Sequence, residues 1–385
     1  MEFFRKRDLF VIFLAIIFLI AVSVFFVQGT GSTQTLVFTE IEEKSVLHTE
    51  PEPPLSPPSP TKLENPPEIV RAVYLTGWSA GSKKYLNYLS SLFENTEINA
   101  VVIDIKDYSG LVSYNSGAIA DIDSLVRFLH AKNIYAIARI SVFEDPILAA
   151  ARPELAVYNE ETKGLWQDNK GLSWMDPASK DVWDYNINLA KDVFYHGFDE
   201  VNFDYVRFPS DGNMSVAGFP VWDQNIPMAE VIKEFFQYVR AGLPNDKISV
   251  DLFGLTTVNS DDMGIGQILE HAFESFDYVC PMVYPSHYAS GFIGFLNPAE
   301  HPYEVIKYSL DSAMARESAL SNQLSKLRPW LQDFDMGANY TSEMVKQEIK
   351  ATQDSLKENY VGYMLWSPSN IYTQEALIKN AEAQE

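Results

Sequence analysis

The sequence predicts an α/β protein: a (β/α)8 TIM barrel preceded by an N-terminal transmembrane helix and a proline-rich linker. From Glu68 onward, short runs of β-branched and aromatic residues alternate with helical patterns, which is typical of a parallel α/β fold. Eight such strand–helix units in about 320 residues match the size of a TIM barrel with insertions. Near the N-terminus, an uncharged apolar run is long enough to cross a bilayer.

The apolar run, residues 9–27, follows Arg5, Lys6 and Arg7. As a helix it would rise roughly 28 Å, close to the hydrocarbon thickness of a bilayer. The positive-inside rule then keeps the N-terminus in the cytoplasm and exports the rest of the chain. We therefore expect residues 1–27 to be a basic cytoplasmic tip and signal anchor, with the lipid bilayer as partner, in a single-pass cell-membrane protein. A cleaved signal peptide, which would leave a secreted protein, is the alternative, although no good A-x-A site follows the run.

Residues 28–67 include the stretch "TEPEPPLSPPSPTKLENPP". Prolines, acids and hydroxyl residues cannot build a core and favour an extended, semi-rigid chain. These residues are expected to form a disordered linker that lifts the barrel domain, residues 68–385, off the membrane. The formal net charge of -23 argues against nucleic acid as a partner, because phosphate binding needs a basic surface.

Each expected strand is a short apolar or aromatic run. In chain order they are "VRAVYLTGW" from Val70, "AVVIDIKD" from Ala100, "IYAIARIS" from Ile134, "DEVNFDYV" from Asp199, "KISVDLFG" from Lys247, "FDYVCPMVYP" from Phe276, "LRPWLQDF" from Leu327 and "YVGYMLWSP" from Tyr360. Ser179 can cap the helix before the fourth strand, and Gly197 can end it. A doubly wound open sheet is the alternative fold. No G-x-G-x-x-G fingerprint follows the first strand, which weakens a dinucleotide-binding version, and we expect no cofactor.

Two insertions follow the third and fourth expected strands, at residues 145–177 and 210–227. Both are βα loops, which lie at the catalytic end of a TIM barrel. They carry Trp166, Trp174 and Trp222, so we expect aromatic side chains at that end.

The fourth strand carries three polar residues at alternate positions. Phe203 and Tyr205 would face the outer helices, while Glu200, Asn202 and Asp204 would face the barrel axis. Polar groups on a buried strand are costly unless something uses them. Because Asp204 lies nearest the C-terminal mouth, we expect it to be catalytic.

Other strands direct polar side chains toward the same mouth. On the second strand Asp104 and Lys106 would face inward, and on the fifth Asp251 would do so. Asp104 and Lys106 could instead form a buried ion pair that only fills the barrel, and Asp333 and Glu144 could be loop or cap residues. The candidate substrate-binding residues, all at or near strand ends, are Asp104, Lys106, Arg139, Asn202, Arg207, Tyr284, Asp333, Trp78 and Trp366.

Acidic and aromatic residues at a barrel mouth suit a carbohydrate ligand. Sugar rings stack on Trp and Tyr, and their hydroxyls pair with carboxylates, amides and guanidinium groups. Glycoside hydrolysis also requires two carboxylates, which Asp204 and Asp251 would supply from separate strands. A metal site is not expected, since the six histidines show no H-x-H or H-E-x-x-H spacing.

Five motifs of the chain resemble those of a bacterial family of glycosyl-hydrolase domains that bears a domain-of-unknown-function label. They are "VYLTGWSAGS", "VVIDIKDYSGLVSY", "FDEVNFDYVRFPSDG", "CPMVYPSHY" and "GYMLWSPSNIY", and the resemblance covers nearly all of residues 69–372. It implies a (β/α)8 barrel distantly similar to the alpha-amylase clan. In that clan a segment like "GFDEVNFD" ends in the nucleophile, which implies this role for Asp204. The chain departs from the clan in two places, with Asn202 in place of an arginine and Asp251 in place of the glutamate acid.

The function expected from these observations is a membrane-anchored, extracytoplasmic glycoside hydrolase that acts on a cell-envelope or extracellular polysaccharide. Asp204 would be the nucleophile or key carboxylate, and Asp251 the general acid/base. A barrel that binds glycan at the cell surface without cleaving it is the alternative. A metal-dependent hydrolase, such as a deacetylase or phosphoesterase, is a third reading.

Overall fold

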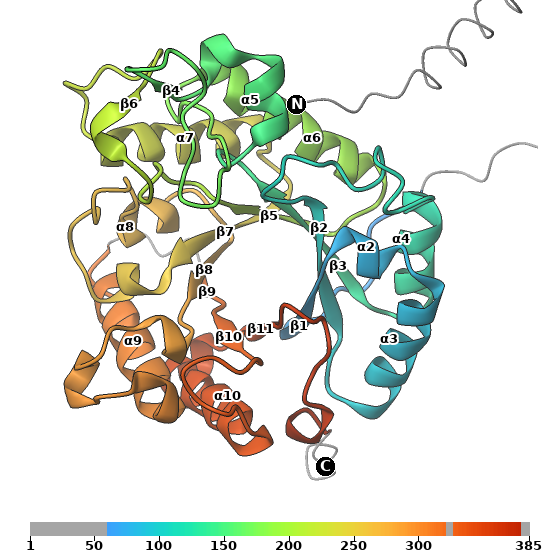
Figure 1. Ribbon diagram of the computed structural model, residues 1–385. Coiled ribbons are helices and arrows are strands. Elements are labelled where there is room, and N and C mark those ends of the chain that lie inside the picture. The colour runs from blue at the N-terminus through green and yellow to red at the C-terminus, as the bar shows by residue number, and fades with distance from the viewer. Residues whose placement is uncertain (1–59, 321–325, 379–385) are drawn as a thin grey trace, which may run out of the picture. The chain divides into compact units, whose positions relative to one another are not determined.

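Eight parallel strands close into a ring in the computed structural model, which describes residues 60–320 and 326–378. They are β1 (Val70–Leu75), β2 (Ala100–Lys106), β3 (Tyr135–Ser141), β5 (Glu200–Asp204), β7 (Lys247–Phe253), β8 (Tyr278–Met282), β10 (Trp330–Gln332) and β11 (Gly362–Trp366). Pairing of β10 with both β8 and β11 completes the ring, and the short β9 (Lys326–Leu327) adds to the edge of β8 (Figure 1). The predicted parallel barrel is therefore confirmed, and the open sheet is excluded.

Helices surround the ring (Figure 1). They are α2 (Gly77–Ala80), α3 (Lys83–Asn95), α4 (Ile122–Ala131), α5 (Pro146–Ala151), α6 (Lys180–Tyr195), α7 (Met228–Gly242), α8 (Leu269–Phe273), α9 (Pro302–Glu317) and α10 (Ser342–Leu356). The sequence explains their ends: Asp121 caps α4 by accepting the Ser124 N–H at 2.8 Å. Ser179 occupies the cap position of α6 without a side-chain hydrogen bond, and Gly197 follows that helix in the left-handed conformation at φ 88°.

Strand alternation divides the apolar residues into two cores. Val201 and Phe203 belong to the larger core between the strands and the helices. Val102, Ile137 and Met364 belong to a smaller core inside the ring. This is the arrangement of a filled TIM barrel, and it leaves every second residue of each strand pointing at the axis.

A buried ion pair fills the lower part of the barrel interior. The Glu200 carboxylate pairs with Arg328, and both side chains are fully buried. Ser249 Oγ donates to Glu200 Oε1 at 2.6 Å, and the Arg328 guanidinium lies 4.2 Å from the Tyr278 ring centre. Because Glu200 begins β5 and Arg328 precedes β10, the pair lies far from the carboxyl ends where TIM barrels bind substrate.

The two insertions pack against each other beside the carboxyl ends of β3 and β5. β4 (Tyr158–Asn159) from the first pairs antiparallel with β6 (Ala217–Gly218) from the second. Asp176 Oδ2 accepts the backbone N–H groups of Val221 and Trp222 at 2.7 and 2.9 Å. The insertions therefore form one wall rather than two free loops.

The apolar run 9–27 and most of the linker lie outside the described residues. Within residues 60–320 and 326–378, no helix has both the length and the apolar character needed to cross a membrane.

Removing one member of the Glu200–Arg328 pair should be costly. Arg328→Met leaves a buried carboxylate without its cation, and we expect the free energy of unfolding to fall by about 3–5 kcal/mol. Urea unfolding measures this loss. In the double variant Glu200→Gln with Arg328→Met, most of the stability should return, and a double variant as unstable as the single one would contradict the assignment.

Candidate active site

A cavity of about 510 Å³ opens at the carboxyl ends of the strands. Its walls come from residues of β3, β5, β7, β8, β10 and β11 and from the loops after β3, β5, β7 and β8. The lining residues are Arg139, Glu144, Asp168, Lys170, Asp204, Tyr205, Arg207, Asp211, Asp251, Phe253, Gly254, Leu255, Gln267, Met282, Tyr284, His287, Tyr288, Trp330 and Trp366.

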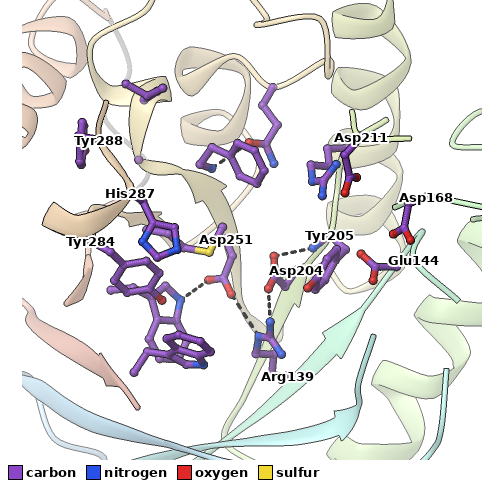
Figure 2. A pocket seen from close by; sticks show the side chains of 18 of the residues that line it. Arg139, Glu144, Asp168, Asp204, Tyr205, Asp211, Asp251, Tyr284, His287 and Tyr288 are labelled. Atoms are coloured by element: carbon purple, nitrogen blue, oxygen red, sulfur yellow. Dashed lines mark hydrogen bonds and ion pairs between the residues drawn. The ribbon is translucent and has the colours of Figure 1, made fainter. Parts of the chain in front are cut away.

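Arg139 of β3 lies at the base of the cavity, close to Asp204 and Asp251 (Figure 2). It pairs with Asp204 of β5, donates to Asp104 of β2 at 2.5 Å, and approaches Asp251 Oδ2 of β7 at 3.6 Å. Tyr74 donates to the second oxygen of Asp104. Burial raises the pKa of Asp104 despite the nearby Arg139 guanidinium. The single guanidinium therefore faces more carboxyl groups than it can neutralise.

Asp204 is fixed through both of its oxygens. Oδ2 pairs with Arg139, and Oδ1 accepts the backbone N–H of Tyr205 at 2.5 Å. Both donors favour the carboxylate form. Asp204 is thus a preorganised anion at the cavity surface.

Tyr205 departs from the sequence prediction that it would face the outer helices. The strand ends at Asp204, and Tyr205 adopts a left-handed conformation with φ 54°, which costs about 1–2 kcal/mol in a non-glycine residue. This turn breaks the alternation, and the Tyr205 ring lines the cavity. Such strain is typical of functional sites.

Asp251 lies deeper, with its side chain 1% exposed. Its Oδ1 accepts Asn202 Nδ2 at 2.8 Å and Trp330 Nε1 at 2.7 Å. Its Oδ2 has no hydrogen-bond partner among the described residues. Burial and the neighbouring Asp204 charge raise the pKa of Asp251 to about 8, so this carboxyl holds a proton at neutral pH.

Glu144 is a cavity residue that the sequence did not single out. It follows the end of β3 by three residues, where the sequence pattern suggests a turn or cap residue. Its carboxyl lines the cavity, the residue is 2% exposed, and Oε1 is buried without a described hydrogen-bond partner. Burial raises the pKa of Glu144 to about 8, against the lowering effect of Arg207. Its position close to a strand end was the available signal for a site residue, because Asp204 also lies at the end of a strand.

Aromatic rings flank the Arg207 guanidinium and form another part of the cavity wall. The Arg207 guanidinium lies between the Trp174 and Phe253 rings, at 4.6 and 4.9 Å from their centres. Tyr284 and Trp366 also line the cavity, and their ring centres lie 5.7 Å apart. Sugar rings and their hydroxyls would find apolar faces and donors in the cavity.

Lys106 lies outside the cavity, and the prediction that it faces the axis is wrong. The pairing of β2 with β3 shifts register between Asp104 and Lys106, so alternation fails there. Lys106 Nζ instead donates to Asp145 Oδ2 and Asn186 Oδ1, both at 2.8 Å, and its side chain is fully buried.

Four other predicted residues do not line the cavity. Asp104 and Asn202 lie beneath it as hydrogen-bond partners of Arg139 and Asp251. Asp333 accepts the Thr373 N–H at 2.8 Å and hydroxyl at 2.6 Å, which ties down the loop after β11. Trp78, on α2, is 63% exposed.

Across the part of the chain that the structure describes, no cluster of three or more His, Cys, Asp or Glu side chains could hold a metal ion.

The raised pKa of Asp251 predicts how stability depends on pH. Below about pH 4 the group is protonated in both the folded and the unfolded chain, so it contributes nothing. Between about pH 4 and pH 8 only the folded chain keeps the proton, so rising pH destabilises the wild type. Asp251→Asn lacks this effect, and its stability relative to the wild type should rise by up to about 1 kcal/mol per pH unit until pH 8.

Urea unfolding at pH 5, 7 and 9 checks this dependence. Asp223→Asn, at an exposed position of the second insertion, is the matched control and should show no such trend. A stability difference for Asp251→Asn that does not change with pH would show that the folded chain does not hold this proton.

Comparison with solved structures shows the same fold in glycoside hydrolases. The glycoside hydrolase domain of PgaB (BpsB) from Bordetella bronchiseptica is 14% identical with a TM-score of 0.56, covering 81% of this chain and 100% of that one. The alpha-galactosidase TtGalA from Thermus thermophilus, in complex with stachyose, is 13% identical with a TM-score of 0.50, covering 82% and 65%. At these identities the likeness concerns the fold alone.

A hypothetical protein from Ruminiclostridium thermocellum ATCC 27405 is 38% identical over 46% of this chain and 96% of its own, with a TM-score of 0.42. No protein of curated function matches the chain. The profile of the family described as "Putative glycosyl hydrolase domain" matches residues 72–372, most of the 385 residues, and the chain belongs to this family.

Proposed function

We propose that this protein is a membrane-anchored, extracytoplasmic glycoside hydrolase that cleaves a cell-envelope or extracellular polysaccharide. The observation that carries the proposal is the state of Asp204, a carboxylate held by Arg139 and the Tyr205 N–H at the surface of a cavity. An anion placed in this way suits attack on, or stabilisation of, a positively charged anomeric carbon.

A second carboxyl group must carry a proton for the leaving group. Asp251 and Glu144 both meet the protonation requirement, because burial raises the pKa of each to about 8. Environments that separate the protonation of neighbouring carboxyl groups are the usual basis of acid and base roles. The pairing of Asp204 with Asp251, expected from the sequence, remains a proposal.

The cavity walls favour a carbohydrate over other neutral ligands. Tyr284 and Trp366 present ring faces, and Arg207 presents a guanidinium whose Nε lacks a hydrogen-bond partner within the described chain. The solved structures that share the fold include a glycoside hydrolase domain and an alpha-galactosidase. A polysaccharide is therefore the substrate class we propose.

The full-length chain, purified in detergent, tests the reaction when it is incubated with peptidoglycan and with α- and β-linked glucans and galactosamine polymers. We expect new reducing ends from one polymer, and a loss of at least about 10³-fold in kcat for Asp204→Asn, because the reaction loses its charged carboxylate. Asp223→Asn should retain wild-type activity.

Equal activity of Asp204→Asn and wild type would contradict the assignment of Asp204. Retention of the chain on one polymer without any cleavage would favour the glycan-binding barrel. Activity that disappears on exhaustive chelation would favour the metal-dependent reading instead.

The proposed anchor predicts where the chain fractionates. Wild type should sediment with membranes and resist extraction with carbonate, because an apolar helix of residues 9–27 would be buried in the bilayer. A chain that lacks residues 1–27 should remain in the soluble fraction. Immunoblotting of the two fractions measures this, and release of wild-type protein into the medium would indicate cleavage of a signal peptide.

A further inference from the structure

The loop that follows β3 is hydrogen-bonded to the end of β5, where Asp204 lies. Ser141, the last residue of β3, lies opposite Asp204 in the strand register. The pairing continues past the strands, since Val142 N donates to Asp204 O at 2.9 Å and Phe143 N to Tyr205 O at 3.4 Å. Glu144 comes next, so its backbone position is set relative to Asp204.

Glu144 offers a carboxyl oxygen that the folded chain does not use. Oε1 is buried and has no hydrogen-bond partner in the described structure, although the carboxyl lines the cavity. An unsatisfied buried polar atom carries a desolvation cost, and a ligand group in the cavity would remove it. Figure 2 shows Glu144 and Asp251 on opposite sides of Asp204.

The protonation state of Glu144 suits proton donation. Burial is the main cause of its raised pKa, and the negative charges of Asp168 and Asp204 add to it. Glu144 therefore carries a proton near neutral pH, and Arg207 lies close enough to favour the anion that remains after the proton has left.

Asp251 is less suited to the same task. Its Oδ1 already accepts two hydrogen bonds, and its Oδ2 points toward Arg139 at 3.6 Å. Its protonation also depends on the charge of Asp204. A proton on Asp251 is thus directed into the carboxyl cluster at the base of the cavity rather than toward a leaving group.

A second buried ion pair fixes the peptide that carries Glu144. Asp145 pairs with Lys106 Nζ at 2.8 Å and caps α5 by accepting the Leu148 N–H at 2.8 Å. Ser141 Oγ donates to the Glu144 carbonyl at 2.9 Å. Hydrogen bonds on both sides therefore restrain Glu144, as expected for a group that must act at a defined point.

We propose that Glu144 is the proton donor to the glycosidic oxygen, and this inference rests on the proposed hydrolase function. As the bond from the anomeric carbon to that oxygen breaks, the oxygen keeps the electron pair and takes the Glu144 proton, so the leaving group departs as an alcohol. The Asp204 carboxylate forms the new bond to the anomeric carbon. The Glu144 carboxylate then takes a proton from water, whose oxygen displaces Asp204 and restores both groups.

Leaving-group dependence tests this role in the full-length chain. Wild type, Glu144→Gln, Asp251→Asn and Asp204→Asn are compared on the polymers named above and on 2,4-dinitrophenyl glycosides of the corresponding sugars. We expect Glu144→Gln to lose about 10²–10⁴-fold in kcat/KM on polymer but less than about tenfold in kcat/KM on the dinitrophenyl glycoside, whose leaving group needs no proton. Its kcat on the dinitrophenyl glycoside should fall, because water then attacks the glycosyl intermediate without the Glu144 base. Azide should restore turnover of Glu144→Gln by giving a glycosyl azide, because a small anion can replace water without base catalysis.

The other variants separate the inference from the proposed function. Asp204→Asn should lose activity on both kinds of substrate, and Asp251→Asn should lose activity to a similar extent on both. Equal losses in kcat/KM of Glu144→Gln on the two substrates, or a leaving-group dependence in Asp251→Asn instead, would overturn the role of Glu144 while leaving the hydrolase in place. Glu144→Asp, with a shorter reach, should give an intermediate loss on polymer and shows that the loss does not come from misfolding.

A measurement without substrate keeps the inference testable if no polymer is cleaved. Carbon-13 NMR of chain labelled at the glutamate carboxyl carbons should show one resonance that titrates near pH 8 and is missing from Glu144→Gln. A resonance for Glu144 that titrates in the ordinary carboxyl range would overturn the inference, whatever the panel of polymers shows.

Discussion

One buried guanidinium sets the charge balance on which the proposed site depends. Arg139 pairs with Asp104 and Asp204 and approaches Asp251, so three carboxyl groups face one cation where burial penalises charge. They cannot all ionise, and the pKa of Asp104 and of Asp251 is raised. The Tyr205 N–H donates to the Asp204 oxygen that Arg139 does not hold. Arg139 lowers the pKa of both Asp104 and Asp251, but burial outweighs its effect.

The backbone around Asp204 extends this constraint into the cavity wall. β5 ends at Asp204, Tyr205 turns with a positive φ, and hydrogen bonds from residues 142 and 143 continue the pairing of β3 with β5 beyond both strands. Outside the ring, the Lys106–Asp145 pair holds the same segment against α6. The Arg139–Asp204 pair lies on the inner face of the sheet, and the Lys106–Asp145 pair lies on its outer face. The segment carrying Glu144 is therefore held from both sides.

Periodicity explains what the sequence could predict and what it could not. Within regular strands, alternation placed Arg139, Asn202 and Asp251 on the inner face correctly, because the side-chain period of two is a property of the strand itself. It failed for Lys106, where a register shift interrupts β2, and for Tyr205, where a left-handed residue ends β5. Glu144 lies in a loop without any period, where it pairs with Trp174 from the far end of the insertion that follows it. The pattern loses its predictive value at the strand ends, which is where barrel sites are built.

The two protonated carboxyl groups respond differently to the reaction that the site would perform. The pKa of Asp251 is raised partly by the charge on Asp204, so it should fall when Asp204 becomes bonded to the sugar and loses that charge. The pKa of Glu144 is raised mainly by burial and is opposed by Arg207, which remains charged throughout. A group that must give up and regain a proton in each cycle needs a stable counter-charge for its anionic form. Glu144 has one in Arg207, whereas the guanidinium nearest Asp251 is already shared with Asp104 and Asp204.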